Sequence, residues 1–197
     1  MTIAHKREDI MTFYSIECSP SAGKNFVLNQ TGDSQECRAI RLFLKKPADG
    51  TPPPFDIHYR AADDVTEAHL DRAIAVPGLQ TIGFSKDFVD TNGNALSDIF
   101  EFVPCQFWLH DKAKFWPFFV VRFRVHTDFY DRDATRAHQR KHGGLTHIYK
   151  ASGLTFDFAA HDSKRSYFTF TQHFVDRFRP LRTGLVITPR DVKVLEV

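Results

Sequence analysis

The sequence predicts an α+β fold, in which short strands form mixed or antiparallel sheets and a few short helices accompany them. Three observations support this prediction. Phe accounts for 20 of the 197 residues, and many of these rings lie in runs rich in β-branched residues, as is typical of strands. Turn-forming residues interrupt the chain often, and one strand–helix–strand pattern occurs twice. The chain is expected to form one domain over residues 1–197, with lobes of 1–110 and 111–197 as the alternative.

The predicted strands are short runs of aromatic and β-branched residues bounded by turns. They span residues 11–19, 37–46, 79–84, 98–110, 115–130, 145–160 (strand, turn, strand), 166–170 and 185–197, with a short element at 26–29 and a hairpin between the fourth and fifth. In residues 37–46, Ile40, Leu42 and Leu44 alternate with basic residues, which favours a strand. The proline-rich segment 47–55 is expected to be a surface connection and the best internal boundary.

Two helices are predicted from capping and stop signals. The first spans residues 63–78, where Asp64 and Glu67 have the spacing of a capping pair. The second spans residues 131–144 and ends at a pair of glycines.

The sequence "GFSKDFVD" at residues 83–90 returns as "TFTQHFVD" at residues 169–176. In each copy a strand leads to a hydroxyl residue in the place of a helix cap, Ser85 or Thr171, and then to a short helix. Turn-forming residues 91–94 are expected to end the first of these helices. The pattern predicts an internal duplication, with copies around 79–104 and 166–189, and the repeated residues are mostly ones that pack.

Several classes of protein are disfavoured. No apolar run reaches the ~18 residues of a membrane span, and the start does not have the pattern of a signal peptide. The cysteines Cys18, Cys37 and Cys105 have no CxxC spacing, which favours reduced thiols in a cytoplasmic protein. Glycine-rich phosphate loops, G-x-S-x-G elbows and recognisable acid–base constellations are not found, so we expect no catalytic residues and no cofactor.

Charge is distributed unevenly along the chain. The net charge is +2, but residues 1–121 sum to −4 and residues 122–197 to +6. In the second predicted helix, Arg132, Arg136 and Arg140 are four residues apart and share a face, and Lys141 adjoins them. This face could bind an acidic protein surface or a phosphate backbone, or it could simply be solvated.

The same helix carries His138 and His142 at i and i+4, and His147 follows, which makes these three weak candidates for zinc ligands. A metalloprotease helix would need Glu where this chain has Gln139, and the neighbouring cations would repel a metal ion. We therefore expect no metal site.

The aromatic and basic run at residues 118–126 could stack nucleic-acid bases if it were exposed. A strand with Arg122 and Arg124 on its solvent face is the favoured interpretation.

Residues 80–197 resemble an immunity-protein family of bacterial polymorphic toxin systems, the eleventh in that series. The resemblance rests on "YFTFTQHFVDRFRPLRTGLVITP" (167–189), on "IGFSKDFVD…FEFVP" (82–104) and on the intervening acidic stretch "RVHTDFYDRDAT" (124–135). It implies a protein that neutralises a co-encoded toxin by direct binding, without a cofactor.

The expected function is therefore that of a cytoplasmic toxin-binding protein, with the basic helix meeting an acidic surface of the toxin. Two alternatives remain. The basic second half could bind nucleic acid, and a metal-dependent hydrolase could be built around His138 and His142.

Overall fold

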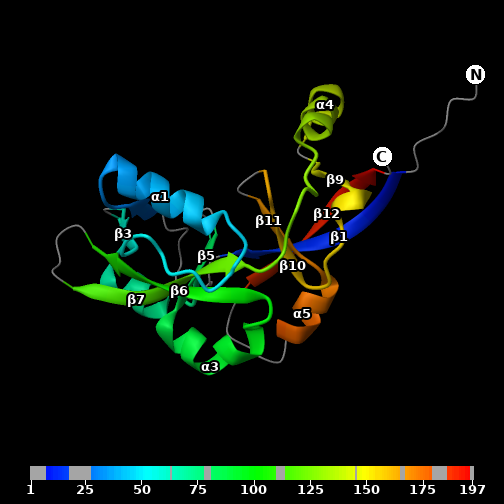
Figure 1. Cartoon of the computed structure of the whole chain (residues 1–197). Coiled ribbons are helices and arrows are strands. Elements are labelled where there is room, and N and C mark those ends of the chain that lie inside the picture. The colour runs from blue at the N-terminus through cyan, green and yellow to red at the C-terminus, as the bar shows by residue number, and fades with distance from the viewer. Residues whose placement is uncertain are drawn as a thin grey trace, which may run out of the picture.

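The computed structural model describes residues 8–17, 28–62, 64–77, 81–109, 114–144, 146–164, 167–178 and 186–195. These residues form two six-stranded sheets with short helices around them (Figure 1), which confirms the predicted α+β class.

The first sheet is built from the middle of the chain, in the strand order β2-β3-β6-β7-β5-β4. The predicted hairpin is present as β6 and β7, which are antiparallel, while β3 runs parallel to β6. The elements are β2 (Leu28–Gln30), α1 (Ser34–Leu44), β3 (His58–Ala61), α2 (Glu67–Arg72), β4 (Ala75–Pro77), β5 (Ile82–Ser85), α3 (Lys86–Leu96), β6 (Phe100–Trp108) and β7 (Phe115–Phe123).

The second sheet combines the first strand of the chain with the C-terminal strands, in the order β8-β10-β11-β1-β12-β9. Its elements are β1 (Glu8–Glu17), β8 (His126–Thr127), α4 (Arg132–His142), β9 (Ile148–Lys150), η2 (Ala151–Gly153), β10 (Ala159–Asp162), β11 (Phe168–Phe170), α5 (Gln172–Phe178) and β12 (Val186–Leu195). The predicted strand 115–130 is thus divided between the sheets, and sheet membership changes after β7, whereas the lobe division at 110/111 falls inside the β6–β7 hairpin.

The prediction of a strand at residues 37–46 is wrong, because this segment belongs to helix α1. Asp33 caps the helix by accepting the backbone N–H groups of Gln35 and Glu36, each at 2.8 Å. The Glu36 carboxylate accepts the N–H of Asp33 in return, at 3.1 Å. This reciprocal capping box satisfies N–H groups that the first turn leaves without partners.

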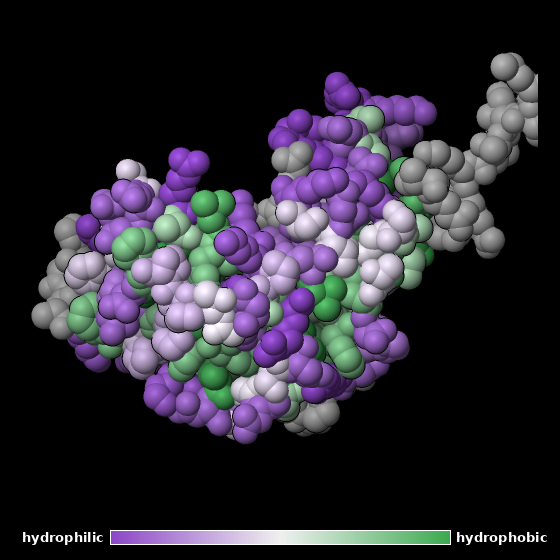
Figure 2. All heavy atoms as spheres, viewed as in Figure 1, coloured by the Kyte–Doolittle hydropathy of each residue, from purple (hydrophilic) through white to green (hydrophobic). Residues whose placement is uncertain are grey.

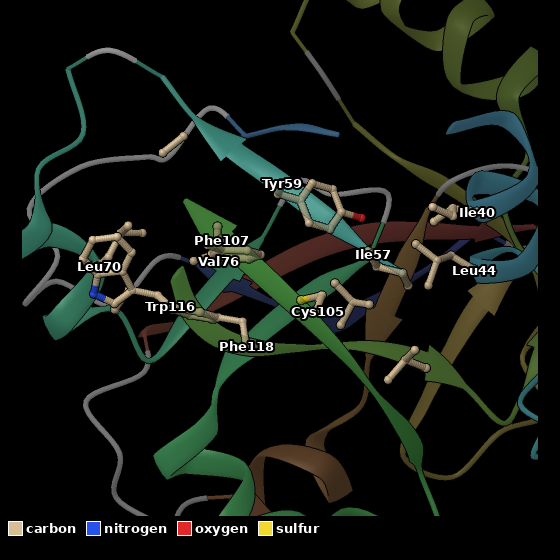
Figure 3. Packing of buried hydrophobic residues seen from close by; sticks show 14 of the residues in the cluster. Ile40, Leu44, Ile57, Tyr59, Leu70, Val76, Cys105, Phe107, Trp116 and Phe118 are labelled. Carbon is tan, nitrogen blue, oxygen red and sulfur yellow. The ribbon is translucent and has the colours of Figure 1, made fainter. Parts of the chain in front are cut away.

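The buried face of α1 has the periodicity of a helix. Ile40, Phe43 and Leu44 are buried at the i, i+3, i+4 spacing of a helix. In Figure 3, Ile40 and Leu44 point from α1 toward Ile57, the residue before β3. Leu42, which completed the apparent strand alternation, is 55% exposed. One exposed leucine therefore imitated a period of two.

The predicted helix at 63–78 is also wrong in extent. Helix α2 begins after Thr66, whose N–H bonds to Nδ1 of His69 at 3.0 Å, so Thr66 replaces the predicted cap. The backbone turns extended at Ala73, and strand β4 follows because Ala75 and Val76 are fully buried and pair with β5. Residues 63 and 78 lie outside the described part.

The two hydroxyl caps of the repeated pattern are confirmed. The Ser85 hydroxyl accepts the N–H of Phe88 at 3.3 Å at the start of α3. The Thr171 hydroxyl accepts the N–H of Phe174 at 3.4 Å at the start of α5. Each cap satisfies a backbone donor of the first turn.

Helix α3 does not end at residues 91–94 as predicted, but continues to Leu96. The reason is packing. Gly93 and Leu96 are buried in the last turns of the helix, and a Cβ added at Gly93 would be 3.2 Å from Cγ1 of Val89 and 3.8 Å from the ring of Phe102 on β6. Gly93 therefore lies on the packed face of α3 and does not form a turn.

The two sheets share one pairing pattern. β7 in the first and β1 in the second are antiparallel to both of their neighbours, and the next strand beyond β6 or β12 is parallel. One row of paired residues corresponds: Ala75, Phe84, Phe119 and Pro104 in the first sheet, and Ala159, Phe170, Tyr14 and Pro189 in the second. Duplication would produce this correspondence, with β1 in the place of β7; common descent itself stays a prediction.

A shared aromatic core joins the sheets. Phe100 lies between the corresponding units, with ring centroids 6.4 Å from Phe84, 6.4 Å from Phe170 and 6.0 Å from Phe174. Phe84 also stacks on Phe88 of α3 at 4.6 Å. Edge-to-face and offset aromatic pairs add to the free energy of burial, so these rings bind the two halves together.

Arg122 does not face solvent as predicted, but is only 1% exposed. Its guanidinium forms ion pairs with Glu101 at 2.8 Å and Asp49 at 3.0 Å. It also lies over the ring of Phe43 on α1, 4.1 Å from the centroid. A buried guanidinium requires partners of this kind, because its desolvation is otherwise costly.

The same guanidinium holds the proline-rich segment 47–55 against the first sheet. It donates to the carbonyl oxygens of Pro47 at 2.7 Å and Thr51 at 3.2 Å. Hydrogen bonds from Thr51, and then from Arg122, lower the pKa of Asp49 to about 2. The segment predicted as an internal boundary is therefore tied to β7.

Replacing Arg122 by Met is expected to destabilise the fold by roughly 3 kcal/mol, because it leaves Glu101 and two backbone carbonyls without their donor. Urea unfolding would measure the change. Arg124→Met is the matched control, since Arg124 lies two residues along and is exposed. An equal loss in both variants would contradict a special role for Arg122.

His126 predicts a pH dependence of stability. It pairs with His161 in the β8–β10 ladder, with the two rings 4.8 Å apart. Burial, and then the charge of His161, lowers the pKa of His126 to about 4. Since the unfolded chain binds a proton near pH 6.5, stability should be present above that pH and fall as the pH drops from about 6.5 to 4.

The change should be smaller in His126→Gln than in the wild type, as measured by urea unfolding between pH 4 and pH 7.5. His142→Gln, at an exposed position of α4, should keep the wild-type slope. An unchanged slope in His126→Gln would refute this assignment.

Candidate docking surface on helix α4

Helix α4 projects from the second sheet at the top of Figure 1, and its first turn fixes it in place. The Asp131 carboxylate caps the helix by accepting the N–H of Ala134 at 2.9 Å. Thr135, 2% exposed, accepts the N–H of Ile148 from β9 at 3.0 Å. Gly143, with φ of +64°, ends the helix. The helix predicted at 131–144 is therefore confirmed, with bounds 132–142.

The basic residues predicted on this helix lie on its surface. Arg136, Arg140 and Lys141 are exposed and Arg132 is half-buried. Of the ion pairs among described residues, none involves these four cations. A groove of about 370 Å³ is lined by Asp133, Arg136, Gln139 and Arg140. Figure 2 shows mostly hydrophilic side chains over the projecting helix.

Comparison with α1 shows that α4 serves the core very little. Both helices have 11 residues, and each precedes the strand that runs parallel to β6 or β12. α1 buries Ile40, Phe43 and Leu44, whereas the buried residue of α4 is Thr135. A helix that is polar on almost every side is not retained for packing in the core, which favours a role in binding for α4.

The three histidines considered as zinc ligands are not grouped. His138 and His142 are neighbours on α4, with ring centroids 4.6 Å apart. His147 instead packs between tyrosine rings, 5.8 Å from Tyr130 and 5.1 Å from Tyr167. Burial, and then Arg190, lowers its pKa. Among the described residues, no cluster of three or more His, Cys, Asp or Glu is suited to a metal ion.

The aromatic run 118–126 is not an exposed stacking platform. Phe118, Arg122 and Phe123 are buried. In β7 the exposed aromatic ring is that of Phe115, which is 47% exposed. Its centroid lies 5.7 Å from that of Trp108 on β6.

Two clefts were not predicted from the sequence. One, of about 490 Å³, lies between α2, the start of α3 and β7. The other, of about 260 Å³, lies between β1, the segment before β10 and the start of α5. The repeated sequence pattern is the one feature of the sequence that could have indicated the two clefts, because corresponding parts of the two units line them.

The described cysteines do not resemble nucleophiles. The Cys37 thiol donates to the carbonyl oxygen of Gly32 at 3.6 Å, and burial raises the pKa of Cys105, which keeps it protonated. Cys18 lies outside the described residues.

Comparisons with known proteins do not assign the chain to a family: no family model, no curated protein and no solved structure matches it. None of the helices in the described ranges is both long and apolar enough to cross a membrane.

Thr135→Val should loosen the attachment of α4, because it leaves the buried N–H of Ile148 without an acceptor. The expected cost is about 1–3 kcal/mol, measured by urea unfolding, together with faster amide exchange in α4. Arg136→Ala, on the exposed face of the same helix, should leave both quantities unchanged. Equal behaviour of the two variants would show that Thr135 does not hold the helix.

Proposed function

We propose that this chain is a non-enzymatic binding protein that neutralises a co-encoded bacterial toxin by direct contact, in the cytoplasm. The resemblance of residues 80–197 to an immunity-protein family suggests the class of partner. The observation that carries the mode of binding is α4, a projecting helix with exposed cations and almost no buried face.

The partner proposed for α4 presents an acidic surface. The helix holds four Lys and Arg against one Asp, and Arg140 and Lys141 stand at its C-terminal end, where the helix dipole favours positive charge. Complementary charge of this kind chiefly raises the association rate and selects the partner.

The first test is the gene neighbourhood. The adjacent gene should be toxic when expressed alone and harmless when this chain is expressed with it, and the two products should copurify. A harmless neighbouring product would remove the basis for the immunity function.

Charge reversal tests the surface. Arg136→Glu with Arg140→Glu should slow association with the toxin at least about 10-fold at low salt and weaken protection of cells. Arg38→Glu with Arg41→Glu is the matched control, because both residues are exposed on α1 and the net charge changes equally. Association rates from surface plasmon resonance compare the pairs, and equal slowing would show a general effect of net charge.

Nucleic-acid binding is the second candidate, since the exposed cations of α4 also suit phosphate groups. It predicts binding to unrelated duplexes with a salt slope of about −0.9 per neutralised phosphate. If Arg136→Glu with Arg140→Glu abolished such binding while the neighbouring gene proved harmless, nucleic acid would replace the toxin as the partner. The structure does not favour a metal-dependent hydrolase, because His147 packs between the rings of Tyr130 and Tyr167.

A further inference from the structure

The two clefts occupy corresponding places in the two units. Residues 11–13 and 171–173 line the smaller cleft. Their counterparts by strand pairing and capping, residues 116–118 and 85–87, line the larger one. Each cleft therefore lies beside the middle strand of its sheet, at the point where a neighbouring strand gives way to a helix.

At the smaller cleft, β1 has an open edge. β1 pairs with β12 along its whole length, but in the described part of the chain its other edge pairs with β11 only at Tyr14. The backbone N–H of Lys193 donates to the carbonyl oxygen of His147, so the backbone polar groups of Lys193 point toward β9. In an antiparallel ladder the opposite residue, Ile10, and also Thr12 then direct their N–H and C=O groups away from β12.

At the larger cleft, the corresponding edge is blocked. The backbone N–H of Gln106 donates to the carbonyl oxygen of Ile57, so the backbone polar groups of Gln106 point toward β3. In the antiparallel ladder, the backbone of its partner Pro117 then points away from β6, toward the free edge of β7. Proline has no N–H to offer, and it is a residue that natural sheets place at edges to prevent pairing. The second sheet has Thr12 in this place, which leaves the donor available.

The open edge also lacks other protection. Ile10 is 72% exposed and Met11 is 45% exposed. Residues 10–13 read Ile-Met-Thr-Phe, without charge or proline, whereas protected edges carry such residues. Ile10 and Thr12 can thus offer two donor–acceptor pairs to an added strand.

We propose that residues 10–13 of β1 bind an extended segment of another protein as an added strand, with one of its side chains in the adjoining cleft. A free segment fits better than a second copy, because about 260 Å³ holds a few side chains and not the edge of a folded sheet. The apolar lining, including Leu154 and Phe156, favours an apolar side chain in the cleft.

The charge of the cleft defines the segment further. Among the described residues that line the cleft, Asp157 is exposed and is the one carboxylate, His173 is the one basic side chain, and none is Lys or Arg. The segment should therefore alternate apolar residues, as strand addition requires, and carry Lys or Arg near the position that meets Asp157. The proposal does not depend on the toxin-binding function, since it rests on the edge and the cleft alone.

The probe is a displayed library of eight-residue segments with apolar residues at alternate positions and random residues between them, selected against the full chain. Binding segments enriched in Lys or Arg are expected. A synthetic peptide of the best sequence should slow amide exchange at Ile10 and Thr12, and N-methylation of its edge-facing amides should abolish binding.

Thr12→Pro should weaken binding of this peptide at least about 10-fold and leave stability nearly unchanged, because the first sheet already accommodates Pro117 at the corresponding place. Thr12→Val is the control: it loses the hydroxyl bond to Asp191 but keeps the N–H, and should bind like the wild type.

Failure to select any segment, or binding that Thr12→Pro does not affect, would overturn the proposal. Light scattering tests the alternative occupant, a second copy of this chain. A concentration-dependent dimer that Thr12→Pro abolishes would show that the edge of β1 binds a second copy, and this result would also overturn the proposal.

Discussion

The aromatic contact around Phe100 is the constraint on which the rest of this structure depends. The two sheets share no hydrogen-bonded strand pair among the described residues, so side-chain contacts join them, mainly the aromatic core, with Arg177 of α5 also bonded to Asp98 and to the carbonyl oxygen of Ala95. Phe100 contacts Phe84 of one unit and Phe170 and Phe174 of the other. Dense packing of this kind tolerates little change in volume. The repeated sequence is therefore best explained by packing, because its Phe residues meet one another.

Local sequence signals were sufficient where local contacts decide the structure. The hydroxyl caps at Ser85 and Thr171, the helix beginning at Asp131 and the β6–β7 hairpin could all be predicted, since their partners lie nearby in the chain. The burial of Arg122 could not, because its bond to Asp49 spans 73 residues of sequence. Among the site residues, the exposure of the α4 cations followed from their pattern, but the clefts required the sheet pairing.

Corresponding positions in the two units differ most where they lie outside the shared core. The pair Ala75 and Phe84 keeps its chemistry in the second sheet as Ala159 and Phe170, because all four residues belong to the shared core. α1 and α4 do not correspond in the same way: α1 covers a sheet face, whereas α4 leaves most of its side chains in water. Pro117 and Thr12 differ likewise at the two strand edges. The same strand arrangement thus leaves a strand edge and a helix face available for binding in the second unit, whereas Pro117 and the packed α1 occupy the corresponding places in the first.

The two open features of the second unit differ in the kind of recognition they can provide. The cations of α4 act over a distance of about 10 Å at ordinary salt, so they influence how often a partner arrives. The edge of β1 acts only in contact, through directional backbone hydrogen bonds, and so would influence how long a segment stays. In the first unit, α1 is held on the sheet by its buried Ile40, Phe43 and Leu44, and Pro117 removes the edge donor. Recognition is therefore expected to be concentrated in the unit that β1 completes.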